Sequence, residues 1–239
     1  MAGDKILVLY DNRSGRSDLQ PGWGFSALIE IGGHRVLFDT GADKLVLEHN
    51  AAALGVDLSA IDTLVLSHEH CDHIGAISSV LHKDLDVFYP ASFSVLFKGE
   101  VEEKLERAPW HAHVVSTSEE IVPGITSTGE MGKEIVEQAL IISTSAGPIL
   151  ITGCAHPGIV GIARVTTQIA KKPLSLVIGG FHLYKSKDDE IKNIVDAFRK
   201  LGVQQIGPCH CTGEHAIMIL REAFGPGGLE VMAGTQIAL

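Results

Sequence analysis

The sequence lacks an uninterrupted apolar run near the length of a membrane span, although 45% of its residues are hydrophobic. A transmembrane helix needs roughly 20 consecutive apolar residues, so this lack favours a soluble globular protein. The N-terminus, Met1 to Lys5, leads directly into a short strand-like run, without the apolar core of a secretory signal peptide. We therefore expect a cytoplasmic location and no membrane partner.

Basic residues are also few. The chain has 19 Lys and Arg residues against 29 Asp and Glu residues, which gives a formal net charge of −10. Phosphate backbones are bound by concentrated Lys and Arg, so this balance argues against a nucleic-acid partner.

The chain has only four cysteines, Cys71, Cys154, Cys209 and Cys211. All of them lie within two residues of a histidine that could bind a metal. In an intracellular chain this placement favours reduced thiols near a metal site over a disulfide framework. The alternative is that they are small buried filler residues.

Strands and helices alternate in both halves of the 239-residue chain, and each half contains a predicted β-hairpin, at residues 25–38 and 139–152. This order predicts an α/β fold in which two sheets pack face to face with helices outside, a four-layer αββα sandwich. We expect residues 1–239 to form one domain. The stretch 91–137 has no clean period, and we interpret it as a variable insertion that could contact substrate or form a lid. The alternative is a solvated amphipathic helix followed by a loop. The expected helices span residues 43–54, 74–81, 159–170 and 188–201.

The most informative stretch is Ser67-His68-Glu69-His70-Cys71-Asp72-His73, which follows the apolar run 64–66. On a strand, side chains two apart share a face, so His68 and His70 could bind one cation while Asp72 and His73 face a neighbouring point. Histidines beside a strand end are often only hydrogen-bonded core or surface residues. Four potential ligands within six residues instead favour two adjacent metals.

Three later strand-like runs also end in turns that carry a histidine, namely His156, His182 and His210. We expect His68, His70 and His156 to form one metal site with an open position. Asp72, His73 and His210 would form a second site with mixed nitrogen and oxygen donors. These ligands suit two divalent transition metals; zinc is our first expectation, and iron or manganese would also fit.

The pattern His-x-His-x-Asp-His resembles the signature of the metallo-β-lactamase superfamily. Further segments are similar to one subfamily, labelled 7,8-dihydropterin-6-yl-methyl-4-(β-D-ribofuranosyl)aminobenzene 5′-phosphate synthase, and the similarity spans nearly the whole chain. They are Tyr10-Asp11-Asn12, residues 24–30, 153–158, 179–183 and 208–213.

Three residues near these motifs have open roles. Asp39 ends a strand and could orient a ligand imidazole, or it could cap the helix that follows. Many superfamily members carry a bridging aspartate after a glycine, where this chain has Cys154, so the thiol could ligate metal or only pack. His182 is either a ligand or a proton donor to the leaving group. Asp72 and His182 are the candidate catalytic residues.

The predicted site favours a hydrolase that uses a metal-activated hydroxide on an ester, lactone or phosphoester small molecule. The resemblance implies an alternative, a synthase that joins a dihydropterin diphosphate to an aryl-ribofuranosyl phosphate, with the metals stabilising the leaving diphosphate. The expected partner is thus a small molecule, with a pterin or a phosphate-containing compound as candidates. A third hypothesis is a non-catalytic, metal-dependent ligand sensor.

Overall fold

A computed structural model describes residues 3–82, 84–99, 103 and 111–239. The chain divides into two compact units. The first unit comprises residues 1–117 and 232–239, and the second comprises residues 118–231. That residues 1–239 act as one domain stays a prediction.

The first unit is built on a seven-stranded sheet with the order β13-β1-β2-β3-β4-β5-β6. Strands β13, β1, β2 and β3 are antiparallel neighbours, whereas β3, β4, β5 and β6 run parallel. The predicted hairpin at residues 25–38 is confirmed as β2 and β3. The strands are β1 (Lys5–Tyr10), β2 (Ser26–Ile31), β3 (His34–Phe38), β4 (Thr63–Val65), β5 (Asp86–Pro90), β6 (His111–Val115) and β13 (Gln236–Ala238).

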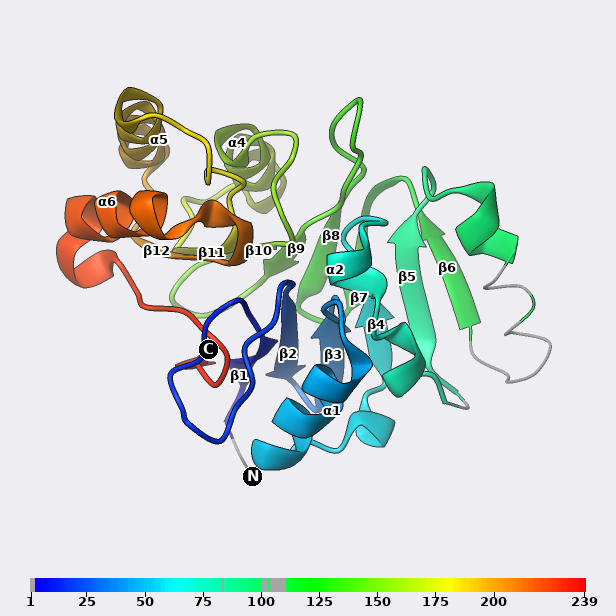
Figure 1. The fold of residues 1–239 in the computed structure, drawn as a ribbon. Helices are drawn as coiled ribbons and strands as arrows, with labels where there is room; N and C mark the ends of the chain where they lie inside the picture. The colour runs from blue at the N-terminus through cyan, green and yellow to red at the C-terminus, as the bar shows by residue number, and fades with distance from the viewer. Residues whose placement is uncertain (1–2, 83, 100–102, 104–110) are drawn as a thin grey trace. The chain divides into compact units, whose positions relative to one another are not determined.

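Helix α1 (Lys44–Ala53) covers this sheet and buries Leu47 in a core that includes Leu9, Leu37 and Leu64. Figure 1 shows it in blue beside β1 to β3. The helix begins at Asp43, whose side chain accepts hydrogen bonds from the first-turn backbone N–H groups. Asp43 is therefore the helix cap, and the interpretation of Asp39 as that cap is wrong.

Replacing Asp43 with Ala should lower the free energy of unfolding by about 1 kcal/mol, because two N–H groups at the start of α1 lose their acceptor. Urea denaturation would measure this change, with the exposed Asp57→Ala, which caps only a three-residue 3-10 turn, for comparison. Equal stability of wild type and Asp43→Ala would contradict the assigned cap.

The second unit contains a six-stranded sheet with the order β12-β11-β10-β9-β8-β7. Strands β10, β11 and β12 are parallel, and β8, β9 and β10 are antiparallel neighbours. The hairpin predicted at residues 139–152 is confirmed as β9 and β10. The strands are β7 (Thr117–Val122), β8 (Ile125–Gly129), β9 (Leu140–Ile142), β10 (Ile149–Thr152), β11 (Leu176–Gly180) and β12 (Gln205–Cys209).

Three helices pack on this second sheet (Figure 1). Helices α4 (Ile159–Ala170) and α5 (Asp188–Leu201) have the predicted bounds, and α6 (Glu214–Phe224) follows β12. They bury Ile162, Phe198 and Leu220 in a core shared with β10 to β12. Each unit is thus a mixed sheet with helices packed on it.

One predicted helix is absent, and one predicted segment is only partly described by the structure. No helix spans residues 74–81: α2 (Cys71–Ile74) begins earlier and has four residues, and a short 3-10 turn, Ile77–Ser79, follows it. A side chain at Gly75 would collide with the carbonyl oxygens of Ala42 and Cys71, so this turn is held tightly against a neighbouring loop. The stretch 91–137 contains β6, β7 and β8, and its residues 100–102 and 104–110 lie outside the described residues.

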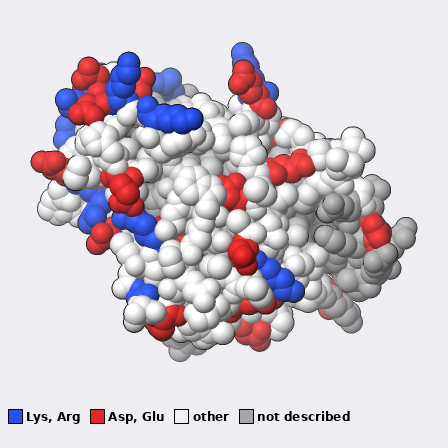
Figure 2. Space-filling model, viewed as in Figure 1, with Lys and Arg blue, Asp and Glu red and all other residues white. Residues whose placement is uncertain are grey.

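The surface mixes charges of both signs. On the face shown in Figure 2, basic residues lie among acidic ones. On α5, Lys192 and Arg199 each lie within 4 Å of an aspartate one turn earlier. Within the described residues, no helix has both the length and the apolar composition needed to cross a membrane.

Candidate metal centre

In the first unit, the carboxyl ends of two parallel strands bring the predicted site residues together. Strands β3 and β4 pair in register, with Phe38 opposite Val65. Asp39 follows β3, and Ser67 to His73 follow β4. Because parallel neighbours end at the same sheet edge, residues 28 to 34 positions apart in sequence become direct contacts.

The Asp39 carboxylate contacts both Ser67 and His73 at this edge of the sheet. Its Oδ1 accepts a hydrogen bond from the backbone N–H of Ser67, and its Oδ2 lies 2.7 Å from the Ser67 hydroxyl and 2.6 Å from His73 Nδ1. Asp39 is fully buried and has a φ of 58°, a strained region that aspartate tolerates better than most residues. Asp39 therefore orients the His73 ring and leaves its Nε2 on the opposite side.

His68 and His70 have the geometry of two ligands to one ion. The Ser67 hydroxyl, which donates to Asp39, lies 2.8 Å from His68 Nδ1 and so fixes that ring. His68 Nε2 lies 3.1 Å from His70 Nδ1. Two nitrogens bound to one zinc at about 2.0–2.1 Å in tetrahedral geometry would be about 3.3 Å apart. The observed separation fits that requirement.

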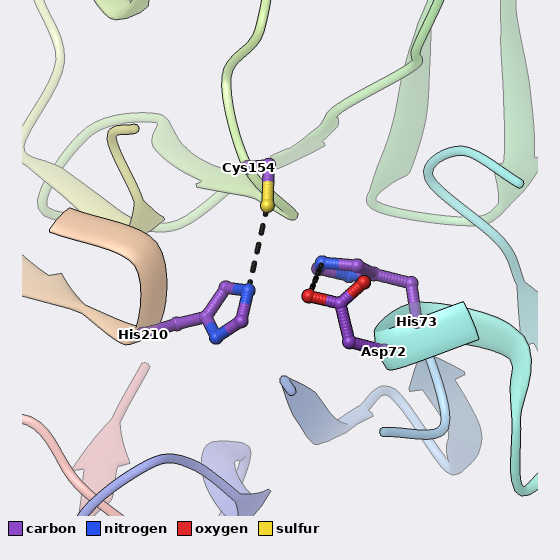
Figure 3. Close-up of side chains that lie close together, drawn as sticks. All are labelled: Asp72, His73, Cys154 and His210. Atoms are coloured by element: carbon purple, nitrogen blue, oxygen red, sulfur yellow. Dashed lines mark hydrogen bonds and ion pairs between the residues drawn. The ribbon is translucent and has the colours of Figure 1, made fainter. Parts of the chain in front are cut away.

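Asp72 and His73 form a second pair, which Figure 3 shows on helix α2. His73 Nε2 lies 3.8 Å from Asp72 Oδ2, and the His73 ring lies 4.2 Å from that of His68. The His73 side chain is fully buried, and that of Asp72 is 13% exposed. A nitrogen and a carboxylate oxygen at this spacing suit a divalent ion.

Glu69 and Cys71 lie in the same motif but are not members of either donor pair. The Glu69 carboxylate accepts hydrogen bonds from the backbone N–H and the hydroxyl of Ser94. Cys71 is exposed. All four cysteines lie among the described residues and none of them forms a disulfide; Cys154, Cys209 and Cys211 are buried.

In the second unit, the carboxyl ends of β10, β11 and β12 meet at one edge of the sheet because these strands are parallel. Ala155, His182 and His210 lie just beyond those ends, and all three have positive φ angles, from 49° to 60°. Non-glycine residues rarely adopt this backbone conformation. It persists only where the surrounding structure over-determines it, and it is concentrated at functional sites.

Cys154 and His210 form the pair that Figure 3 shows in this unit. Cys154 Sγ lies 3.4 Å from His210 Nε2, and both residues are buried. A thiolate and an imidazole on one tetrahedral zinc would be about 3.6 Å apart, so this pair also fits a shared ion. Burial raises the pKa of the Cys211 thiol, but hydrogen bonds with Cys154 and His182 lower it to about 5.

His156 and His182 complete the donors of the second unit. Their ring centroids lie 4.5 Å apart, and ligand atoms of Cys154, His156 and His182 all lie within 4.8 Å of one another. His156 Nδ1 lies 3.2 Å from the buried Glu137 carboxylate, whereas His182 is exposed. This set could hold a metal ion and leaves His182 accessible to a substrate.

Glu137 and Ser67 are supporting residues that the sequence analysis missed. Ser67 stands inside the histidine motif, yet a serine beside a ligand has no distinctive pattern. Glu137 lies in the stretch interpreted as a variable insertion, 19 residues before the histidine that it contacts. Its only sequence signal is a carboxylate shortly before a predicted strand, which is too common to identify a role.

Replacing Glu137 with Gln should weaken metal affinity about 10- to 100-fold, because the His156 ring loses its charged acceptor. Competition with a chromophoric chelator would measure the affinity. The exposed Glu134→Gln is a control with the same chemical change. Unchanged affinity in Glu137→Gln would show that this contact does not support a ligand.

The sequence profile of the metallo-beta-lactamase superfamily matches residues 20–163, which is more than half of the chain. The chain belongs to the metallo-β-lactamase superfamily. A solved structure, that of Tm1679, a metal-dependent hydrolase of this superfamily, is 31% identical and covers 99% of both chains with a TM-score of 0.82. These matches confirm the predicted superfamily and its α/β fold class.

Two curated relatives of this chain come from Methanocaldococcus jannaschii. A 7,8-dihydropterin-6-methyl-4-(beta-D-ribofuranosyl)-aminobenzene-5'-phosphate synthase is 28% identical over 92% of this chain and 91% of its own length. An uncharacterized protein is 29% identical over 91% of this chain and 94% of its own length. The superfamily consists mostly of enzymes that bind divalent metals, and candidate groups of His, Asp and Cys donors are present here.

Proposed function

We propose that this protein is a metal-dependent hydrolase that cleaves an ester, lactone or phosphoester bond in a small molecule. The observation that carries the proposal is the paired spacing of donor atoms in each unit of a metallo-β-lactamase chain. His68 and His70 are 3.1 Å apart in one unit, and Cys154 and His210 are 3.4 Å apart in the other. Both separations suit ligands of a single ion.

The proposed cofactors are two divalent transition metals, with zinc as the first choice. We assign His68, His70 and His156 to one ion. We assign Asp72, His73 and His210 to the other, with Cys154 in the place where many members of the superfamily have a bridging aspartate. Iron or manganese would accept most of these donors, but a thiolate favours the softer zinc or iron.

The bound ions would activate water for attack and polarise the substrate's electrophilic atom. The chain's own residues hold the ligand rings in place, since Asp39 orients His73, Ser67 orients His68, and Glu137 orients His156. Asp72 is partly exposed beside His73 and can accept a proton from attacking water. His182, exposed beside His156, can donate a proton to the leaving group.

A synthase activity is the second candidate, and the relative named as a dihydropterin synthase favours it. The same donor sets would then stabilise a leaving diphosphate without activating water. Both activities require a small-molecule substrate, which for the synthase carries phosphate. Neither requires nucleic acid, in line with the net charge of −10.

Metal analysis and turnover assays together test the proposal. Protein purified without chelators should contain close to two equivalents of transition metal by plasma mass spectrometry, and less than one equivalent would overturn the dinuclear assignment. Asp72→Ala should lose turnover of bis(p-nitrophenyl) phosphate, p-nitrophenyl acetate or a homoserine lactone by about 10²-fold or more. His215→Ala, which removes an exposed histidine paired with Asp188, is the matched control.

The substrates distinguish the two candidate activities. Turnover of any of the three probes that disappears in Asp72→Ala but not in His215→Ala supports the hydrolase. Coupling of a dihydropterin diphosphate to an aryl-ribofuranosyl phosphate, without hydrolysis of the probes, would replace the hydrolase with the synthase. Full metal content with neither activity would favour a metal-dependent ligand sensor.

A further inference from the structure

An open pocket of about 290 Å³ lies against the candidate site, within the second unit. Its walls come from the start of α4, from the turn that follows β11 and from α5, and α4 and α5 appear together in Figure 1. His156, from the turn after β10, and His182, from the turn after β11, also line it. The side chains that line it are otherwise apolar, and they include Ile159, Val160, Phe181 and Ile194.

The volume and the lining together limit what the pocket can hold. A cavity of about 150 Å³ takes a single benzene ring, so one of about 290 Å³ has room for a fused two-ring group. Apart from the two imidazoles, the lining offers no side chain that could hydrogen-bond to ring nitrogens or oxygens. A hydrocarbon-like ring system therefore fits better than a heterocycle rich in polar groups. The polar groups of such a heterocycle would lose their hydrogen bonds to water, and the apolar side chains of the lining would not replace them.

The two histidines determine which end of a ligand meets the candidate site. His156 is 8% exposed by its side chain and contacts Glu137, while His182 is exposed and lies 4.5 Å from it, ring to ring. A ring seated among Val160, Phe181 and Ile194 would thus have its reactive substituent beside these imidazoles.

We propose that this pocket is the substrate subsite that binds a planar, largely apolar two-ring aromatic group. The reactive ester or phosphoester would then be placed next to His156 and His182. This inference rests on the proposed function for the identity of the bound molecule as substrate. It adds the substrate class, which neither the ligand residues nor the relatives' names supply.

Gly161 offers a way to fill the pocket with little effect on the fold. It lies in the first turn of α4 and lines the pocket, and a Cβ built on it meets nothing within 4 Å. Gly161→Leu should place its side chain in the space that the ring would occupy. Gly161→Ala removes the same glycine but adds only a methyl group, so it is the matched control.

The experiment measures binding of 2-naphthoate, benzoate and decanoate to the purified metal-containing protein by titration calorimetry. All three probes share a carboxylate, so they differ only in the apolar part. We expect the dissociation constant of 2-naphthoate to be lower than that of benzoate by about 10-fold or more, because the second ring is buried. Gly161→Leu should lose this preference and Gly161→Ala should keep it.

A second filling variant, Val160→Phe, keeps the test decisive if Gly161→Leu does not fold, as judged by circular dichroism. An unchanged naphthoate preference in both filling variants would overturn the proposal. Tighter binding of decanoate than of 2-naphthoate would replace the aromatic class with an acyl chain and would also overturn it. Binding needs no turnover, so a chain without hydrolase activity that still shows the predicted pattern would refute the proposed function alone.

Discussion

Replacing Asp39 with Asn is expected to weaken metal binding about 10- to 100-fold and to lower the free energy of unfolding by about 2 kcal/mol. The carboxylate accepts from the Ser67 backbone, the Ser67 hydroxyl and His73. An amide can still accept from the Ser67 N–H, but its NH₂ group would face the hydroxyl and the imidazole. The rings of two proposed ligands, His73 and His68, would then lose their orientation, because Ser67 also contacts His68.

The matched control for this prediction is Asp84→Asn. Asp84 also has a positive φ, 67°, but it is exposed and lies outside the site. Because asparagine tolerates this backbone conformation, neither variant should strain the chain. Chelator competition and urea denaturation of both variants would separate the loss of the Asp39 contacts from a general effect of the substitution. Equal metal affinity in Asp39→Asn and wild type would show that Asp39 does not act through the ligands.

Gly180→Ala should have the second large effect, a loss of about 1–3 kcal/mol in stability together with a loss of bound metal. Gly180 ends β11, between the turns that carry Cys154 and His210. A Cβ there would collide with the carbonyl oxygen of Gly153, and it would lie 2.7 Å from Cys211 Sγ and 3.2 Å from the His210 ring. The backbone on both sides must shift to make room, and the two proposed ligands, Cys154 and His210, shift with it.

Gly161→Ala is the control for this glycine substitution. It adds the same methyl group at a helical position with open space around it. Alanine favours the helix over glycine, so this variant should be more stable than wild type by about 0.5–1 kcal/mol. Thermal unfolding and plasma mass spectrometry would measure both variants. Normal metal content and stability in Gly180→Ala would contradict the tight packing assigned to this turn.

The regular elements could be read from the sequence because their local signals agree with the tertiary structure. Apolar strand runs bounded by glycine turns gave both hairpins, and α4 and α5 have amphipathic patterns with clear starts and ends. The histidine motif was also evident locally, since four potential ligands occur within six residues. The position of Asp39 at a strand end predicted a contact with the imidazole of a candidate ligand, without saying which one, and the structure places its Oδ2 2.6 Å from His73 Nδ1.

Features that depend on distant residues could not be read in this way. Strand β7 has exposed residues at most positions and little alternation of apolar and polar residues. Its sequence therefore carries no pattern that would predict a strand. The predicted helix at 74–81 fails because the backbone N–H of Ala76 donates to the carbonyl oxygen of Gly41, in a loop distant in sequence, and so does not continue α2. The contact between Glu137 and His156 was also not predictable. It forms only after β9 and β10 pair as antiparallel strands and bring the two residues together, and no local sequence pattern encodes that.

Anomalous diffraction from crystals of the purified protein, recorded at the zinc, iron and manganese absorption edges, tests the central claim most directly. We predict two peaks, one within about 2.3 Å of nitrogens of His68, His70 and His156 and one at the same range from donors of Asp72, His73 and His210. The same maps show whether Cys154 and His182 are ligands. The absence of any peak at these donors, in protein shown by mass spectrometry to carry metal, would contradict the account.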